Sequence, residues 1–196
     1  MNLPNKLTVL RICLVPVFIV IMMLPASVMP ALWSGIVGVT LFIIASLTDM
    51  LDGKIARKYG LVTDFGKLMD PLADKFMVIS SMVAILVWMM LRGETTLALV
   101  FVWVVLIILL RELGVTSLRL VVAGNSGIVV AASMLGKIKT VSQMAGTVIL
   151  LVEPAIPFFC DNHILSYVLM AVMAFTTLFS GLDYLKAYLP HIDANK

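Results

Sequence analysis

The chain has 196 residues, of which 62% are hydrophobic and 13% are charged, and its mean hydropathy is +1.12. Ordinary soluble domains carry about 25% charged residues, so this composition excludes a soluble monomer, and it equally excludes a disordered chain. The formal net charge of +3 is too small to indicate a nucleic-acid-binding protein. A membrane-crossing helix needs about 20 apolar residues. We therefore predict an all-α integral membrane bundle in which residues 1–196 form a single membrane-embedded domain.

The apolar runs in the first half of the chain predict four transmembrane helices. The stretch 12–48 has no charged residue, but it is too long for one crossing and is interrupted by Pro25, Ser27 and Pro30. We therefore expect two helices there, joined by a tight turn. Residues 76–91 and 95–110 form the next two runs, and the segment 92–94 between them predicts a second tight turn.

The second half of the chain predicts two more crossings with a less regular pattern. We expect a loop near Gly124 and a fifth helix that begins at about Ala131, because glycine and polar residues interrupt the apolar run there. Prolines and polar residues in 154–162 indicate another turn, and the run 164–182 predicts the last helix. The sequence therefore predicts six transmembrane helices in total.

The basic residues predict how these helices are oriented. With six crossings, all but one of the 14 lysines and arginines fall on one side of the membrane, and the exception is Arg92. Cytoplasmic segments of membrane proteins retain an excess of positive charge. We therefore expect both termini to be cytoplasmic.

Four aspartates mark the most informative segment of the chain, residues 48–75. Asp49 and Asp52 are three residues apart, and Asp70 and Asp74 are four apart. On a helix such pairs point within about 60° and 40° of each other, so each pair shares a face and the two pairs can face each other. Carboxylates without nearby histidine or cysteine form an all-oxygen site, which suits Mg²⁺, Mn²⁺ or Ca²⁺ rather than zinc. Asp64 lies outside this spacing, and we expect it in the connecting loop.

The residues around the aspartates indicate a site for a metal-bound diphosphate. Gly53, Ala56 and Gly66 remove side-chain bulk near the acids, and Arg57 offers a guanidinium to a phosphate. The alternative is that the acids only pair with neighbouring lysines and arginines in a charged rim. That alternative does not explain why acids and small residues share one face on two successive helices, at a cost of about 2–3 kcal/mol per charge at depth in a membrane.

The pattern is a recognisable signature: Asp49-x-x-Asp52-Gly53-x-x-Ala56-Arg57, then eight residues, then Gly66-x-x-x-Asp70-x-x-x-Asp74. At every fixed position it resembles the CDP-alcohol phosphotransferase family of membrane enzymes. The resemblance implies a displacement at phosphorus, in which an alcohol attacks the β-phosphate of a CDP-linked lipid and CMP leaves. It also implies a six-helix fold and a homodimer in a bacterial inner membrane, and the distribution of basic residues implies an active site that faces the cytoplasm.

The same resemblance implies roles for individual residues. Asp49, Asp52 and Asp70 would ligate two divalent cations, Mg²⁺ or Mn²⁺, and Asp74 would complete the metal site and serve as the candidate general base. The residues implied in CDP binding are Gly53, Ala56, Arg57 and Gly66, together with Asn5, Thr8 and Arg11 near the start of the chain. The last three are equally compatible with ordinary capping and snorkelling at a helix start.

A group of basic residues in the second half of the chain indicates what kind of alcohol is the acceptor. These residues are Arg111, Arg119, Lys137 and Lys139, and Thr140 adds a hydroxyl donor. Such a cationic group suits an acceptor that carries a phosphate, although the positive-inside rule alone also places cations on this side. Residues 111–119 and 136–144, with Asn5, Thr8 and Arg11, are similar to those of bacterial family members that use glycerol 3-phosphate. That likeness implies that the substrates are CDP-diacylglycerol and glycerol 3-phosphate.

Two alternative functions remain open from the sequence. The same chemistry could use another acceptor, namely inositol phosphate, serine or phosphatidylglycerol. A small cation transporter could also place acids within membrane helices. Transporters commonly have inverted repeats and charged sites at the membrane midplane, whereas these acids cluster at one membrane boundary, which disfavours a transporter.

Overall fold

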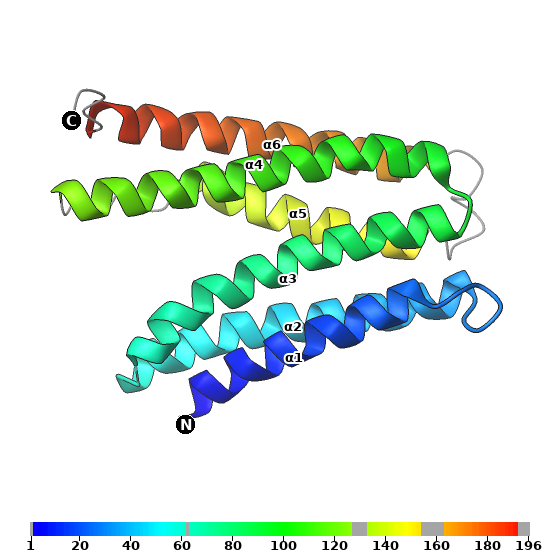
Figure 1. The fold of residues 1–196 in the computed structure, drawn as a ribbon, viewed down its shortest axis with the longest axis horizontal. Coiled ribbons are helices and arrows are strands. Elements are labelled where there is room, and N and C mark those ends of the chain that lie inside the picture. The colour runs from blue at the N-terminus through cyan, green and yellow to red at the C-terminus, as the bar shows by residue number, and fades with distance from the viewer. Residues whose placement is uncertain (1, 62, 127–132, 154–162, 192–196) are drawn as a thin grey trace. The chain divides into compact units, whose positions relative to one another are not determined.

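The computed structural model describes residues 2–61, 63–126, 133–153 and 163–191, and these residues form helices without any strand. The helices are, in chain order, α1 (Leu3–Met23), α2 (Ala31–Tyr59), α3 (Asp64–Leu91), α4 (Thr95–Ser126), α5 (Met134–Val152), α6 (Ile164–Tyr188) and the short 3-10 helix η3 (Leu189–His191) (Figure 1). Within this part of the chain, six helices are long and apolar enough to cross a membrane. The all-α class and the six predicted crossings are therefore confirmed.

Two of the expected turns lie where the sequence predicts them. Between α1 and α2, the backbone N–H groups of Val28 and Met29 donate to the carbonyl of Pro25, at 2.9 and 3.0 Å. Between α3 and α4, Gly93 adopts a left-handed conformation with φ of +83°, which a residue without a side chain adopts readily. The turn expected within 154–162 lies outside the described residues.

Several helices are longer than the apolar runs that predict them. The fourth helix continues through Gly124 to Ser126, so the loop expected near Gly124 is wrong. The fifth helix begins at Met134, and Ala131 lies outside the described residues. Asp64 is the first residue of α3 and not a loop residue, a position where a carboxylate is favourable because of the helix dipole. The helices continue through charged residues, because helical backbone hydrogen bonding is not interrupted where the charged side chains have partners or reach solvent.

The chain forms two compact units. The first unit comprises Met1–Ala98 and Leu150–His163, and the second comprises Leu99–Ile149 and Ile164–Lys196. The single-domain assignment for residues 1–196 stays a prediction.

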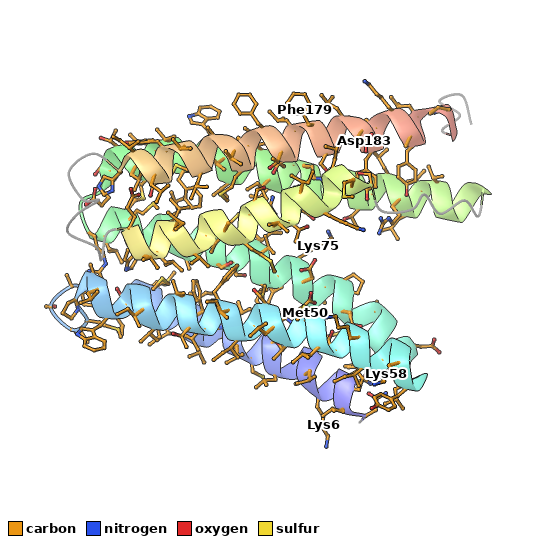
Figure 2. All side chains as sticks on the ribbon, turned by 180° about the vertical axis from the view of Figure 1, so that it is seen from behind. Lys6, Met50, Lys58, Lys75, Phe179 and Asp183 are labelled. Carbon is orange, nitrogen blue, oxygen red and sulfur yellow. The ribbon has the colours of Figure 1, made fainter. Side chains whose placement is uncertain are left out.

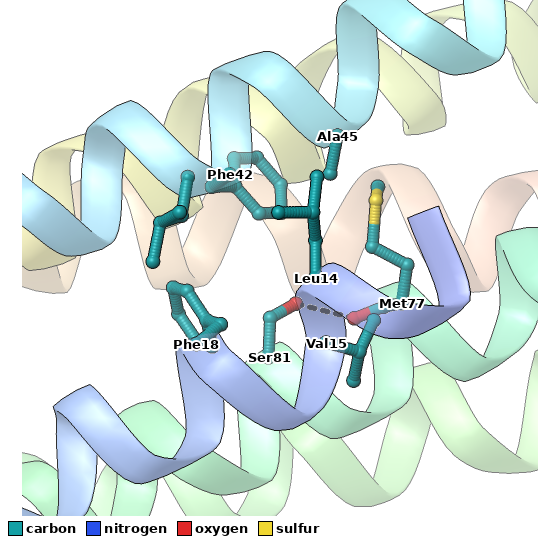
Figure 3. A pocket seen from close by; sticks show the side chains of 8 residues that line it. Leu14, Val15, Phe18, Phe42, Ala45, Met77 and Ser81 are labelled. Carbon is teal, nitrogen blue, oxygen red and sulfur yellow. Dashed lines mark hydrogen bonds between the residues drawn. The ribbon is translucent and has the colours of Figure 1, made fainter. Parts of the chain in front are cut away.

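In the first unit, α1 packs against both α2 and α3 (Figure 1). Phe18 of α1, Phe42 of α2 and Met77 of α3 are buried where the three helices meet. Figure 3 shows the small cavity that these residues line, with a volume of about 10 Å³. A cavity of this size holds at most one water molecule, so the three helices are closely packed.

Small residues on α2 allow this unit to pack closely. A Cβ atom added at Gly35 would lie 2.4 Å from the backbone oxygen of Leu151, and one added at Gly38 would lie 2.9 Å from the methyl carbon of Met22. Both glycines therefore face other parts of their own chain. Ser34 is also buried, and its hydroxyl accepts hydrogen bonds from Trp88 at 3.0 Å and from Arg92 at 2.7 Å.

We predict that Gly35→Ala lowers the stability of the protein by about 1–3 kcal/mol, the usual range for overpacking, because backbone at Leu151 must shift. Thermal unfolding in detergent measures this effect. The matched control is Gly114→Ala on α4, where the described residues place no atom within 4 Å of an added Cβ apart from the nearby backbone of the same helix. The control is expected to be neutral or slightly stabilising, because alanine favours helix over glycine. Equal melting temperatures for Gly35→Ala and the wild type would contradict this account of the packing.

In the second unit, side-chain hydrogen bonds link α5 to α6. The hydroxyls of Ser142 and Thr176 lie 2.7 Å apart, and Gln143 Nε2 donates to Thr177 Oγ1 at 3.1 Å. Such bonds contribute to helix association in membranes because lipid offers polar groups no alternative partner.

Candidate functional site

Three polar residues form one buried face of α1 in the first unit. Asn5, Thr8 and Arg11 are spaced at i, i+3 and i+6, so they lie on the same side of the helix. Their exposed fractions are 7%, 0% and 0%. Buried polar groups of this kind need partners, and the partners lie on α2 and α3.

Arg11 holds the two aspartates of α2. Its Nη1 atom lies 2.8 Å from Asp49 Oδ1, and its Nη2 atom forms a second ion pair with Asp52 Oδ2. Asp52 is buried, whereas the Asp49 side chain keeps 40% of its surface exposed. The i, i+3 spacing of the two aspartates therefore does bring both carboxylates to one point, as predicted, and the residue at that point is a guanidinium.

Thr8 connects this ion pair to α3. Its hydroxyl donates to Asp70 Oδ1 at 2.7 Å and lies 3.5 Å from Asp52 Oδ2. Asp49, Asp52 and Asp70, from two different helices, thus gather around Arg11 and Thr8 of α1. We call these five residues the aspartate cluster.

The start of α3 is built around the same face of α1. Thr63 caps α3, because its hydroxyl accepts from the Gly66 backbone N–H at 3.0 Å and donates to Asn5 Oδ1 at 3.1 Å. A Cβ added at Gly66 would lie 3.2 Å from Asn5 Oδ1 and 3.7 Å from Asp70 Oδ2. Glycine at this position therefore leaves a small space between Asn5 and Asp70.

The aspartate cluster suits a divalent cation in its chemistry. Its three carboxylates and one hydroxyl offer oxygen atoms, and oxygen atoms are the ligands that Mg²⁺ and Mn²⁺ prefer. Among the described residues, however, no three histidine, cysteine or acidic side chains stand together in a position to hold a metal. The reason lies in Arg11, which supplies the positive charge between Asp49 and Asp52. A divalent cation bound there would have to share or replace the guanidinium as the partner of these carboxylates.

Arg11 also has capacity for a further anion. Its Nε atom is buried and has no hydrogen-bond partner within the part of the chain that the structure describes. An orphaned guanidinium N–H is compatible with a phosphate oxygen as its partner.

The other predicted site residues in the first half of the chain are not part of the aspartate cluster. Asp74 is exposed, one turn after Asp70 on α3, so the two residues of this pair differ in their surroundings. Gly53 and Ala56 are half-buried on α2, and the Ala56 carbonyl accepts from the Leu61 N–H at 3.0 Å just after that helix ends. The Arg57 side chain lies outside the described residues.

Two exposed basic side chains lie toward the end of the first unit that holds the aspartate cluster. Lys6 near the start of α1 and Lys58 near the end of α2 lie at the same end of the unit, and the side chain of Lys6 points away from the helices (Figure 2). Both lysines are exposed.

In the second unit, the predicted acceptor residues separate into buried and exposed sets. Arg111 and Lys139 are bonded to Glu112, whereas the side chains of Arg119, Lys137 and Thr140 are exposed. The Thr140 hydroxyl donates to the Gly136 carbonyl of its own helix at 3.1 Å. Lys137 and Lys139 differ because residues two apart on a helix point in nearly opposite directions. The assignment of these cations to the phosphate of the acceptor stays a prediction.

Three residues complete the environment of Arg111, and sequence reasoning missed two of them, Ser180 and Tyr184. Its Nη1 lies 3.0 Å from Glu112 Oε1, and its Nη2 donates to Ser180 Oγ at 2.8 Å. Its guanidinium carbon lies 5.2 Å from the centre of the Tyr184 ring. The i, i+4 spacing of Ser180 and Tyr184 was a usable signal for a shared helix face, but only the fold brings that face to α4.

Comparisons with known proteins agree with the motif. The family model described as CDP-alcohol phosphatidyltransferase matches residues 1–179. A Bacillus subtilis protein named CDP-diacylglycerol–glycerol-3-phosphate 3-phosphatidyltransferase is 42% identical over 195 residues, covering 93% of each chain. A protein of the same name from Pseudomonas fluorescens is 36% identical, over 98% of this chain and 92% of its own. A Mycobacterium tuberculosis protein named probable phosphatidylglycerophosphate synthase is also 36% identical, over 93% and 79%.

Proposed function

We propose, because this chain belongs to the CDP-alcohol phosphatidyltransferase family, that it transfers the phosphatidyl group of CDP-diacylglycerol to sn-glycerol 3-phosphate. The products are phosphatidylglycerophosphate and CMP. The names of the relatives from Bacillus subtilis and Pseudomonas fluorescens support this acceptor.

The observation that carries the proposal is the aspartate cluster itself. Asp52 and Arg11 are almost fully buried in helices apolar enough to cross a membrane, and Asp49 and Asp70 are joined to the same cluster. Ionisable groups in such a position are expensive and mark a functional site by default. Their match to the family signature supports the proposal that this site carries out transfer from a CDP-linked lipid.

We assign the metal-binding role to the cluster's three aspartates, with Asp74 completing the site. Two divalent cations, Mg²⁺ or Mn²⁺, would when bound neutralise the diphosphate and favour departure of CMP. Arg11, Thr8 and Asn5 line the side of the cluster formed by α1, and they are suited to orient the cytidine diphosphate. Gly53, Ala56 and Gly66 leave room for the same group, and Arg57 is the further candidate for its phosphates.

The reaction is an in-line displacement at the β-phosphorus. The acceptor hydroxyl oxygen forms a new bond to this phosphorus, and the bond to the oxygen that becomes part of CMP breaks. Asp74 takes the proton of the attacking hydroxyl, since an exposed carboxylate is accessible to an acceptor that arrives from water. The cations Arg111, Arg119, Lys137 and Lys139, with Thr140, bind the phosphate of the acceptor.

We further propose that the enzyme is a homodimer in a bacterial inner membrane. An even number of crossings leaves both termini on one side of a membrane, and six helices are long and apolar enough to cross. The excess of basic residues on that side supports the cytoplasm as its location. Lys6 and Lys58, at the end of the first unit that holds the cluster, agree with a cytoplasmic site.

The test is CMP release by the protein purified in detergent, with CDP-diacylglycerol and either Mg²⁺ or Mn²⁺. Separate reactions contain glycerol 3-phosphate, inositol phosphate, serine, phosphatidylglycerol or no acceptor. We expect CMP release only in the reaction that contains glycerol 3-phosphate as the acceptor. We expect no CMP release when EDTA removes the divalent cations.

The other outcomes distinguish the alternatives. Turnover with a different acceptor would retain the aspartate cluster as the catalytic site and overturn the assignment of the four cations. Cation uptake into proteoliposomes without any release of CMP would support a transporter instead.

A further inference from the structure

One carboxylate in the second unit holds two cations from two different helices. Glu112 Oε1 accepts from Arg111 Nη1 of α4 at 3.0 Å, and the same oxygen forms an ion pair with Lys139 Nζ of α5. The three side chains keep only 12%, 9% and 8% of their surface exposed, for Arg111, Glu112 and Lys139 in that order. We call them the Glu112 cluster.

The Glu112 cluster carries more positive than negative charge. Two cations, Arg111 and Lys139, share the one carboxylate of Glu112. Excess charge in a poorly hydrated environment is unfavourable unless a counter-ion compensates it. Each of the three side chains keeps part of its surface exposed, where an anion can meet it.

The anion that fits best is a phosphate group. Arg111 is anchored on both sides, by Ser180 Oγ at 2.8 Å and by the Tyr184 ring at 5.2 Å from its guanidinium carbon, so its orientation is restricted. A fixed guanidinium beside an ammonium provides several converging N–H donors, which matches the oxygens of a phosphate better than a neutral hydroxyl.

We propose that Glu112 is a positioning residue that determines acceptor specificity. Its carboxylate draws Arg111 and Lys139 together, and without it the two cations repel each other and separate. The gathered cations bind the phosphate of the acceptor, so Glu112 controls the affinity for a phosphate-bearing alcohol without touching the reacting atoms. The proposal rests on the function proposed above.

The variant that tests this role is Glu112→Gln, which preserves side-chain shape and removes the charge. We expect the KM for glycerol 3-phosphate to rise by about 10- to 100-fold, the effect of losing a hydrogen bond to a charged group. We expect kcat and the KM for CDP-diacylglycerol to change less than about threefold. Glu112→Asp restores the charge one methylene short and should recover part of the lost affinity.

The matched control is Gln143→Met in the same unit. Gln143 is as deeply buried as Glu112 and also bonds to a neighbouring helix, but its partner among the described residues is the Thr177 hydroxyl and not a cation. A merely structural role for Glu112 predicts that both variants lower the melting temperature alike and leave the KM for glycerol 3-phosphate unchanged. That pattern, or a loss of kcat at constant KM in Glu112→Gln, would overturn the proposal.

A binding measurement separates this proposal from the proposed function. We expect millimolar glycerol 3-phosphate or inorganic phosphate to raise the melting temperature of the wild-type protein without CDP-diacylglycerol, whereas glycerol does not. Glu112→Gln should lose this shift, and Glu112→Asp should retain part of it. If the wild type releases no CMP with glycerol 3-phosphate, the proposed function fails, yet this shift still tests Glu112. Equal shifts in the wild type and both variants would reject the role of Glu112.

Discussion

Asp70→Asn is expected to abolish CMP release while leaving a folded protein in the membrane. The amide preserves the volume of the side chain and can still accept the hydrogen bond from Thr8, which the carboxylate accepts at 2.7 Å. The charge that balances a divalent cation is lost. We expect activity to fall by at least about 10²–10³-fold, the range for removing one group that stabilises developing charge.

The control for this prediction is Asp64→Asn, the same substitution on the same helix. Asp64 lies in the first turn of α3, where its charge interacts with the helix dipole, and it is not part of the aspartate cluster. We expect nearly wild-type CMP release and a stability loss below about 1 kcal/mol. Full activity in Asp70→Asn would remove Asp70 from the mechanism.

Arg11→Met is expected to lower the stability of the protein more than Gly35→Ala does. Arg11 is fully buried and is the cation between Asp49 and Asp52, so its removal leaves two carboxylates facing each other without compensation. Breaking a buried ion pair in this way costs about 3–5 kcal/mol, and the partial exposure of Asp49 places the expected loss at the lower end. Thermal unfolding in detergent with EDTA measures this loss.

The same variant tests whether a divalent cation competes with the guanidinium. We expect Mn²⁺ to raise the melting temperature of Arg11→Met more than that of the wild type, because the carboxylates of the variant have no other partner. Lys6→Met on the exposed surface of α1 serves as the control and should behave like the wild type. An equal effect of Mn²⁺ on Arg11→Met and the wild type would show that Arg11 and the metal do not compete.

The sequence alone determined the architecture of the membrane domain. Apolar runs of sufficient length predict six helices because a chain in a bilayer must satisfy its backbone hydrogen bonds internally. The turns at residues 25–30 and 92–94 followed from proline and glycine, whose backbone preferences are local. The i, i+3 spacing of Asp49 and Asp52 placed both on one face for the same reason, since helical periodicity is a local property.

Helix ends were less predictable, because charged residues do not end a helix when their side chains have partners. The fourth helix passes through Arg111 and Glu112 to Ser126, and both charged residues find partners on neighbouring helices. A hydropathy pattern counts each charged residue as unfavourable in a membrane, but it contains no information about the partner that offsets this free-energy cost. The loop expected near Gly124 was misplaced because glycine and polar residues there continue the helix to Ser126, which their weak intrinsic preferences do not prevent.

Only the tertiary structure decided which polar residues meet. It placed Arg11 between Asp49 and Asp52, joined Asp70 to Thr8, and left Asp74 exposed. It also separated Lys139, which is bonded to Glu112, from Lys137, which is exposed. The physical reason is that helical spacing fixes the face on which a residue lies, whereas the partner of that face depends on how helices distant in the sequence pack together.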